Sequence, residues 1–230
     1  EMGPVANNLL DCKIIEDTLV LIEDILDFAE KYNKDMLPTL KKEITLYEGV
    51  DYLYYPKNEN GERFGYIHDE FQWFHRHPEL SFKEIETTKR IRQDLQKGGL
   101  HILNLPLETG VVAEVGTGKH PIVAIRCDID ALPVTEKADV PHRSEHPDCM
   151  HACGHDTHTA ILMGTAEILA SIKSELKGTV KFIFQPAEEI GQGAKIMINT
   201  GDWYEKIDSV FGLHIWSGLD SGKISLESGE

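Results

Sequence analysis

The second half of the sequence alternates strand-like and helix-like segments, and this alternation limits the fold more than any other feature. Apolar, β-favouring runs occur at Ile122–Arg126, Val180–Phe184 and Ser209–Ile215, and helical patterns lie between them at Ile161–Ile172 and Ala194–Asn199. Strands that alternate with helices pair mainly in parallel, and the helices cover both faces of the sheet. We therefore predict an α/β fold with a mainly parallel or mixed sheet flanked by helices.

The residues before Ile122 carry further local signals. A helix is expected at Tyr66–Arg76 and ends at His77-Pro78, because a residue that precedes proline avoids helical geometry. The segment Ser81–Glu84 matches a capping box, which predicts that the next helix begins there and ends at Gly98-Gly99. Two strand-like runs follow, at Leu100–Leu105 and Val111–Val115.

The first 65 residues differ from the rest. Apolar residues recur every three or four positions over Lys13–Lys31, which indicates an amphipathic helix, and no residue of this region belongs to a chemical motif. We therefore divide the chain into a helical N-terminal extension of unknown role, residues 1–65, and an α/β region, residues 66–230.

The composition excludes several classes of partner. The chain has 39 acidic and 23 basic residues and a net charge of −16, whereas nucleic acids and anionic membranes require a basic face. We find no run of eighteen apolar residues and no charged-then-apolar leader, so we expect neither a membrane-spanning nor a secreted protein. The four cysteines do not make a disulfide framework, and a thiolate ligand prefers a reducing compartment, which favours the cytoplasm.

The segment Met150–Ala160 concentrates metal-binding side chains. It contains three histidines, one cysteine and one aspartate within eleven residues. Cys153 and His155 are two positions apart, so both can point at one ion in an extended or turning segment, whereas in a helix they would diverge by about 200°. Thiolate with imidazole suits zinc, and also cobalt, nickel or manganese when the other ligands are carboxylates.

Polar side chains also follow each of the three predicted core strands. In open α/β sheets, ligands bind beyond the carboxyl ends of the strands, so one pocket is expected to collect these side chains. Neighbouring carboxylates are costly to bury unless cations neutralise them, which favours a metal centre with one or two ions. The expected members are Asp128, Asp130, Cys153, His155, Glu188, Glu189 and His214.

Five segments of the chain, taken together and in this order, resemble one enzyme family. They are Phe74–Ser81 (FHRHPELS), Arg126–Pro133 (RCDIDALP), Met150–Asp156 (MHACGHD), Gln185–Glu189 (QPAEE) and Gly212–His214 (GLH). They are similar to the amidohydrolase branch of the aminoacylase and carboxypeptidase metallopeptidase family. That branch includes hippurate hydrolases, indole-acetyl-amino-acid hydrolases and N-acetyl-diaminopimelate deacetylases. The resemblance covers about residues 66 to 228 and leaves the N-terminal extension outside.

The resemblance implies metal-dependent hydrolysis of the amide bond of N-acyl amino acids. It implies a site with two divalent ions, which are zinc, manganese, cobalt or nickel, held by Cys153, His155, Glu189 and His214. Glu188 would be the general base. Adjacent side chains at a strand end diverge, so one glutamate can bind metal while its neighbour faces the reacting water.

The resemblance also assigns supporting roles to three aspartates. Asp130 is counted with the catalytic residues, because relatives outside this branch have an aspartate there that orients a histidine ligand. Asp128 occupies the place of that histidine, and we expect Asp128 and Asp156 to support the ligands from behind.

Relatives of this kind continue beyond the point that corresponds to Glu230. They add a lid and dimerisation domain and then return to the catalytic fold with a further histidine ligand. A homodimer is therefore expected only if such a lid exists. Two alternatives remain open: a metal-binding fragment or homologue without turnover, and a peptidase that acts on short peptides.

The remaining histidines and cysteines have simpler interpretations. His75 and His77 flank a helix end and are expected to be structural, while His151 and His158 either extend the site or pack beside it. Cys127 is expected to be buried and Cys149 to be a spare thiol. We expect surface positions for His68, His101, His120, His142 and His146.

Overall fold

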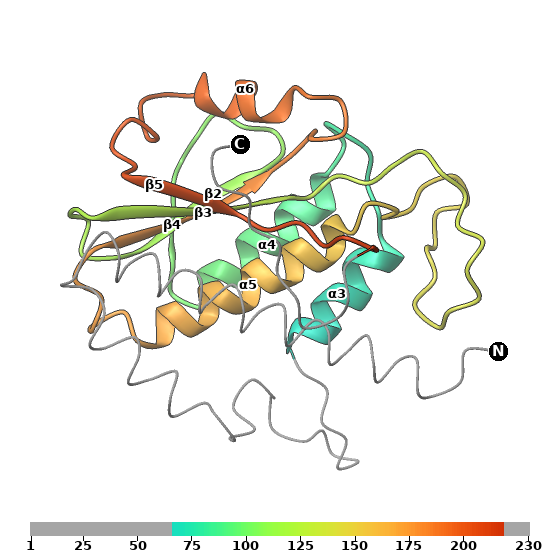
Figure 1. Ribbon diagram of the computed structural model, residues 1–230, viewed down its shortest axis with the longest axis horizontal. Coiled ribbons are helices and arrows are strands. Elements are labelled where there is room, and N and C mark those ends of the chain that lie inside the picture. Colours follow the sequence, from blue (N-terminus) through green and yellow to red (C-terminus); the bar gives the residue numbers. More distant parts are fainter. Residues whose placement is uncertain (1–65, 219–230) are drawn as a thin grey trace, which may run out of the picture.

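The structure, a computed structural model, describes residues 66–218 as a mixed five-stranded sheet with helices on both faces (Figure 1). The elements are α3 (Tyr66–Arg76), α4 (Ile85–Lys97), β1 (His101–Ile102), β2 (Val111–Gly116), β3 (Ile122–Asp128), α5 (His155–Ser171), β4 (Thr179–Gln185), α6 (Gly193–Ile198) and β5 (Ser209–Gly212). The predicted α/β class is confirmed, and α3 has the predicted bounds. The helix expected at Lys13–Lys31 lies outside the described residues.

The strands follow the order β1-β2-β4-β3-β5. Strands β4, β3 and β5 are parallel, with Ile125 beside both Phe182 and Phe211, whereas β2 runs antiparallel to β4 and β1 antiparallel to β2. The parallel part therefore comprises three strands, and their carboxyl ends meet at one edge of the sheet.

The main core lies between the sheet and the layer formed by α3, α4 and α5 (Figure 1). Phe182 and Phe184 of β4 are fully buried there, and Leu162 of α5 is almost so. Burying a side chain of this size contributes roughly 1.5–3 kcal/mol. Helix α5 packs so closely on α3 at Gly164 that an added Cβ there would lie 2.6 Å from the Ile67 side chain.

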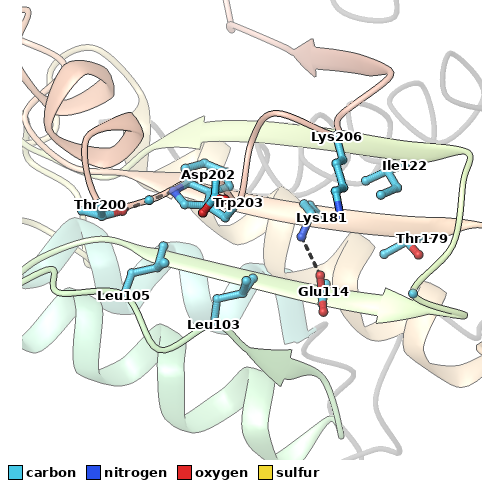
Figure 2. Close-up of a pocket in the computed structure, with 12 residues that line it drawn as sticks. Leu103, Leu105, Glu114, Ile122, Thr179, Lys181, Thr200, Asp202, Trp203 and Lys206 are labelled. Carbon is cyan, nitrogen blue, oxygen red and sulfur yellow. Dashed lines mark hydrogen bonds and ion pairs between the residues drawn. The ribbon is translucent and has the colours of Figure 1, made fainter.

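Helix α6 covers the opposite face of the sheet over a smaller apolar cluster that includes Val112, Ile183 and Met197. Within the predicted strand Leu100–Leu105, only His101–Ile102 forms β1. Leu103 still donates its N–H to the Val112 carbonyl at 2.9 Å, and the side chains of Leu103 and Leu105 pack against this second cluster. A pocket of about 430 Å³ opens on the same face at the amino ends of β3 and β4, where Lys181 Nζ contacts Glu114 Oε2 at 2.6 Å (Figure 2).

The predicted capping box before α4 is wrong. Helix α4 begins at Ile85, and its free amides are capped by the Glu79 carboxylate, which accepts hydrogen bonds from the N–H groups of Glu86 (3.2 Å) and Thr87 (2.8 Å). Ser81 does not serve as a cap, because its hydroxyl donates to Asp130 at the sheet edge.

Helix α5 begins six residues before the predicted start, at His155, directly after Gly154. Gly154 has φ +91°, a left-handed conformation that glycine adopts without strain. The first turn of α5 consists of polar residues that are buried in the fold, so the sequence does not show the apolar periodicity by which a helix is predicted there. No helix within residues 66–218 is long and apolar enough to cross a membrane.

Candidate metal centre

The polar edge of the parallel strands gathers the predicted metal-binding side chains. Asp128 ends β3, Glu188 and Glu189 follow β4, His214 follows β5, and His155 begins α5. Three overlapping groups of side chains have ligand atoms within 4.8 Å of one another. They are Cys153, His155 and His214; His155, Glu188 and Glu189; and Asp128, His155 and His158.

His155 occupies the centre of this cluster and is fully buried. Its Nδ1–H donates to the carbonyl oxygen of Asp130 at 2.8 Å, so Nε2 carries the lone pair. Nε2 and the Glu189 Oε1 atom are both buried, lie 3.9 Å apart and have no hydrogen-bond partner among the described residues. Because buried polar atoms nearly always have a partner, this pair fits a cation between them.

A thiol and a second imidazole lie beside this pair. His214 Nδ1–H donates to the carbonyl of Ile215 at 2.6 Å, which turns Nε2 toward Cys153, where the Sγ–Nε2 distance is 3.4 Å. Burial and the charge of Glu189 raise the pKa of the free Cys153 thiol to about 11. A metal ion at this position would reverse that effect, since a coordinating thiol is deprotonated.

Glu188 and Glu189 do not diverge as expected of adjacent residues at a strand end: a carboxylate oxygen of each lies within 4 Å of His155 Nε2, and the two side chains differ in exposure. The Glu189 side chain is 18% exposed and that of Glu188 is 40% exposed, with Glu188 Oε2 3.8 Å from His155 Nε2. Burial and the charge of Glu188 raise the pKa of Glu189, against the opposing effect of His155. The more buried carboxylate suits metal binding, and the more open one can meet substrate and water.

Asp128 lies under the cluster and is held by cations and imidazoles. Its Oδ1 accepts from His158 Nδ1 at 2.7 Å, and its Oδ2 lies 3.0 Å from Arg126 and 3.6 Å from His155. These contacts hold the pKa of Asp128 well below its usual range despite burial. His158 also accepts the Ile215 N–H at Nε2, so both of its ring nitrogens are occupied and it is unavailable as a ligand.

Asp130 contacts the two glutamates through their backbone. Its Oδ1 accepts the Glu188 N–H at 3.0 Å, and its Oδ2 accepts the Glu189 N–H at 3.1 Å and the Ser81 hydroxyl at 2.6 Å. Although burial opposes the effect, contacts with His155 and these donors keep the pKa of Asp130 below its usual value. Asp130 therefore positions other groups and does not reach into the cluster itself.

The sequence from residue 124 to residue 229 matches the model of the family described as Peptidase family M20/M25/M40. This match falls on the strands and loops that build the cluster. The chain belongs to the M20 family.

Curated M20 relatives extend the match toward the N-terminus. N-acetylcysteine deacetylase of Bacillus subtilis (strain 168) is 49% identical over 157 residues, which are 67% of this chain and 41% of that protein. IAA-amino acid hydrolase ILR1-like 5 of Arabidopsis thaliana is 44% identical over 168 residues, with 70% and 38% covered. N-acyl-L-amino acid amidohydrolase of Geobacillus stearothermophilus is 43% identical over 158 residues, with 67% and 42% covered. The chain thus spans about two fifths of these relatives.

Two solved structures show the same fold. The Bacillus subtilis YXEP protein, described as a dinuclear metal binding peptidase from the M20 family, matches with a TM-score of 0.64 and 48% identity over 66% of this chain and 43% of that chain. A putative aminohydrolase from methicillin-resistant Staphylococcus aureus matches with a TM-score of 0.62 and 38% identity, with 67% and 41% covered. The resemblance to the amidohydrolase branch is confirmed.

Asp156 lies apart from this M20 cluster, in a buried network that sequence patterns did not reveal. Its Oδ2 contacts His75 Nδ1 at 2.6 Å, and His75 Nε2 lies 3.2 Å from Glu136 Oε1. Although burial opposes the effect, these carboxylates raise the pKa of His75 to about 9. His142 packs edge-on against His75, so the predicted surface position of His142 is wrong. The network connects α3, α5 and the loop after β3.

The other candidate side chains have structural surroundings. Burial lowers the pKa of His151 to about 4, so this residue is a neutral core histidine that belongs to none of the three ligand groups. His77 stacks on Trp73 at 4.5 Å. Cys127 is buried as predicted, and Cys149 is buried as well, with its Sγ near the carbonyl of Pro78.

Proposed function

We propose that this chain is part of the catalytic domain of an M20 amidohydrolase that cleaves the amide bond of N-acyl amino acids. The observation that carries the proposal is the buried pair His155 Nε2 and Glu189 Oε1, which has no hydrogen-bond partner within residues 66–218 and lies next to the thiol–imidazole pair Cys153 and His214. The names of the relatives, which are deacetylases and amidohydrolases of acylated amino acids, support the substrate class.

Cys153, His155, Glu189 and His214 would hold two divalent ions, which are zinc, manganese, cobalt or nickel. When bound, such ions polarise an amide carbonyl and lower the pKa of water to about 7. We propose the cytoplasm as the compartment, because a thiolate ligand needs reducing conditions.

Glu188 would act as the general base. Its carboxylate is the more open of the pair, and Asp130 fixes its backbone, so it can accept a proton from the attacking water. The same carboxyl group would then deliver that proton to the amine that leaves. Asp128 and His158 are hydrogen-bonded to each other beneath the metal-binding side chains, and in this proposal they do not take part in the transfer of the water proton.

The experiment compares turnover with metal content in the 230-residue chain. We expect Glu188→Ala to reduce amine release from acetyl- and benzoyl-amino acids at least about a hundredfold, because general-base catalysis contributes this much or more. Metal content, measured by mass spectrometry, should stay close to that of the wild type. Glu175→Ala, which removes an exposed carboxylate beyond α5, should change neither quantity.

The outcomes separate the competing assignments. Loss of metal from Glu188→Ala would show that Glu188 is a ligand and that another group is the base. A wild-type chain that binds metal but releases no amine would favour metal binding without turnover. Cleavage of dipeptides in preference to acyl amino acids would favour a peptidase. In the whole protein we propose a lid, a further histidine ligand and dimerisation through that lid.

A further inference from the structure

The turn that carries the two glutamates has an unusual backbone. Ala187 has φ +49°, and it immediately precedes Glu188 and Glu189. A side chain in the left-handed region is strained, and such a conformation persists only where its surroundings fix it. The question is therefore which groups hold this turn.

Two buried carboxylates bind three consecutive amides of the turn. The Ala187 N–H donates to Glu84 Oε1 at 2.8 Å, while the N–H groups of Glu188 and Glu189 donate to the two oxygens of Asp130 at 3.0 and 3.1 Å. Glu84 is 0% exposed and Asp130 is 1% exposed. Since the Ala187 N–H is buried, removal of the Glu84 carboxylate would leave it without an acceptor.

Both carboxylates depend on the segment between α3 and α4. Glu84 comes from this segment itself, and the Ser81 hydroxyl of the same segment donates to Asp130 at 2.6 Å. The Ala131 N–H donates to the carbonyl of Glu79 at 2.8 Å, which attaches the backbone after Asp130 to the same segment. Ser81 and Glu84, whose spacing resembles a helix cap, thus hold the turn after β4 instead.

We propose that Glu84 is a positioning residue that fixes the Ala187–Glu189 turn and so directs the Glu189 carboxylate toward His155. The inference rests on the proposed function, because it takes Glu189 as a metal ligand and Glu188 as the base. Without the Glu84 carboxylate, Ala187 relaxes toward an ordinary backbone conformation, and the carboxylate of Glu189 is no longer held 3.9 Å from His155 Nε2.

The test measures Co²⁺ affinity of the 230-residue chain by absorption spectroscopy, well below the melting temperature of each variant. We expect Glu84→Ala to weaken Co²⁺ binding about tenfold, as for other groups that orient metal ligands. The thiolate–cobalt absorption from Cys153 should persist. Glu84→Gln should recover affinity to within about threefold, because its amide oxygen can accept the Ala187 N–H as a weaker, neutral acceptor.

Glu79→Ala is the matched control, since it removes another carboxylate of the same segment and uncaps α4 without touching the turn. It should lower the melting temperature and leave Co²⁺ affinity unchanged. Wild-type affinity in Glu84→Ala, or an equal loss in Glu79→Ala, overturns the proposal. If Glu84→Ala does not fold, Ser81→Ala tests the same set of contacts to the Ala187–Glu189 turn, and unchanged Co²⁺ affinity in that variant also overturns the proposal.

The cobalt measurement also separates this inference from the proposed function. A wild-type chain that binds Co²⁺ but releases no amine would end the proposed function of the chain. Loss of Co²⁺ affinity in Glu84→Ala and its recovery in Glu84→Gln would still support the positioning role of Glu84. If the wild-type chain is active and Glu84→Ala keeps full Co²⁺ affinity, the proposed function stands and only the positioning role of Glu84 is overturned.

Discussion

His75 is a largely buried histidine whose protonation the structure couples to folding. It lies between Asp156 (2.6 Å) and Glu136 (3.2 Å), and the three side chains are 12%, 2% and 3% exposed, respectively. The two carboxylates raise the pKa of His75 from 6.5 to about 9 against the opposing effect of burial. Replacement by glutamine removes the titrating group and keeps a polar side chain that can donate a hydrogen bond.

The raised pKa predicts a loss of stability in alkaline solution. A histidine whose pKa is raised by folding stabilises the folded state fully below pH 6.5, and this contribution disappears as the pH rises through about 9. At about 1.4 kcal/mol for each tenfold change in proton affinity, the contribution is roughly 3 kcal/mol. That is a large share of the 5–15 kcal/mol typical of a folded domain.

Urea denaturation in the presence of a chelator measures this contribution. Between pH 6 and pH 9.5 the unfolding free energy of the wild type should fall by roughly 3 kcal/mol more than that of His75→Gln. His77→Gln is the control, because His77 follows α3 directly, its side chain is 35% exposed and its contact with Glu145 is 3.7 Å long. The unfolding free energy of this variant should show the wild-type pH dependence. Parallel curves for the wild type and His75→Gln would refute the reasoning.

Three further changes test the site and the core. Cys153→Ala should weaken metal binding at least about tenfold, and an unchanged affinity in competitive chelation would remove this thiol from the site. Gly154→Ala should lower the unfolding free energy by roughly 1–3 kcal/mol, since it forces a side chain to φ +91° and puts a Cβ 2.3 Å from Ile215; an unaltered urea midpoint would contradict this. Phe182→Ala should cost about 3–5 kcal/mol in the same assay, because the ring is fully buried, and a cost below about 1 kcal/mol would show that the core refills the space.

The location of the cluster could be predicted because it depends on little more than the identity of three strands. The runs at Ile122–Arg126, Val180–Phe184 and Ser209–Ile215 lie on β3, β4 and β5, although β5 ends at Gly212, and His214 follows the strand. Parallel strands bring their carboxyl ends to one edge, so errors of a few residues in strand length do not move the cluster.

The supporting contacts could not be predicted, because they join segments that are distant in sequence. Ser81 and Glu84 satisfy a local capping pattern, yet their side chains bind Asp130 and the Ala187 amide, which lie 49 and 103 positions away. Glu136 and His142 lie in a loop whose polar composition indicates solvent exposure, whereas both are buried beside His75. Local patterns carry no information about such partners.

The strand order also determines when this domain can form its sheet during synthesis. β2 and β3 are consecutive and separated only by residues 117–121, but β4 lies between them in the sheet. Until β4 has been synthesised, β2 and β3 each have an unpaired edge where β4 would bind, and unpaired strand edges can pair with other chains. We expect newly made chains that end before Thr179 to aggregate, and we expect chaperones to bind them.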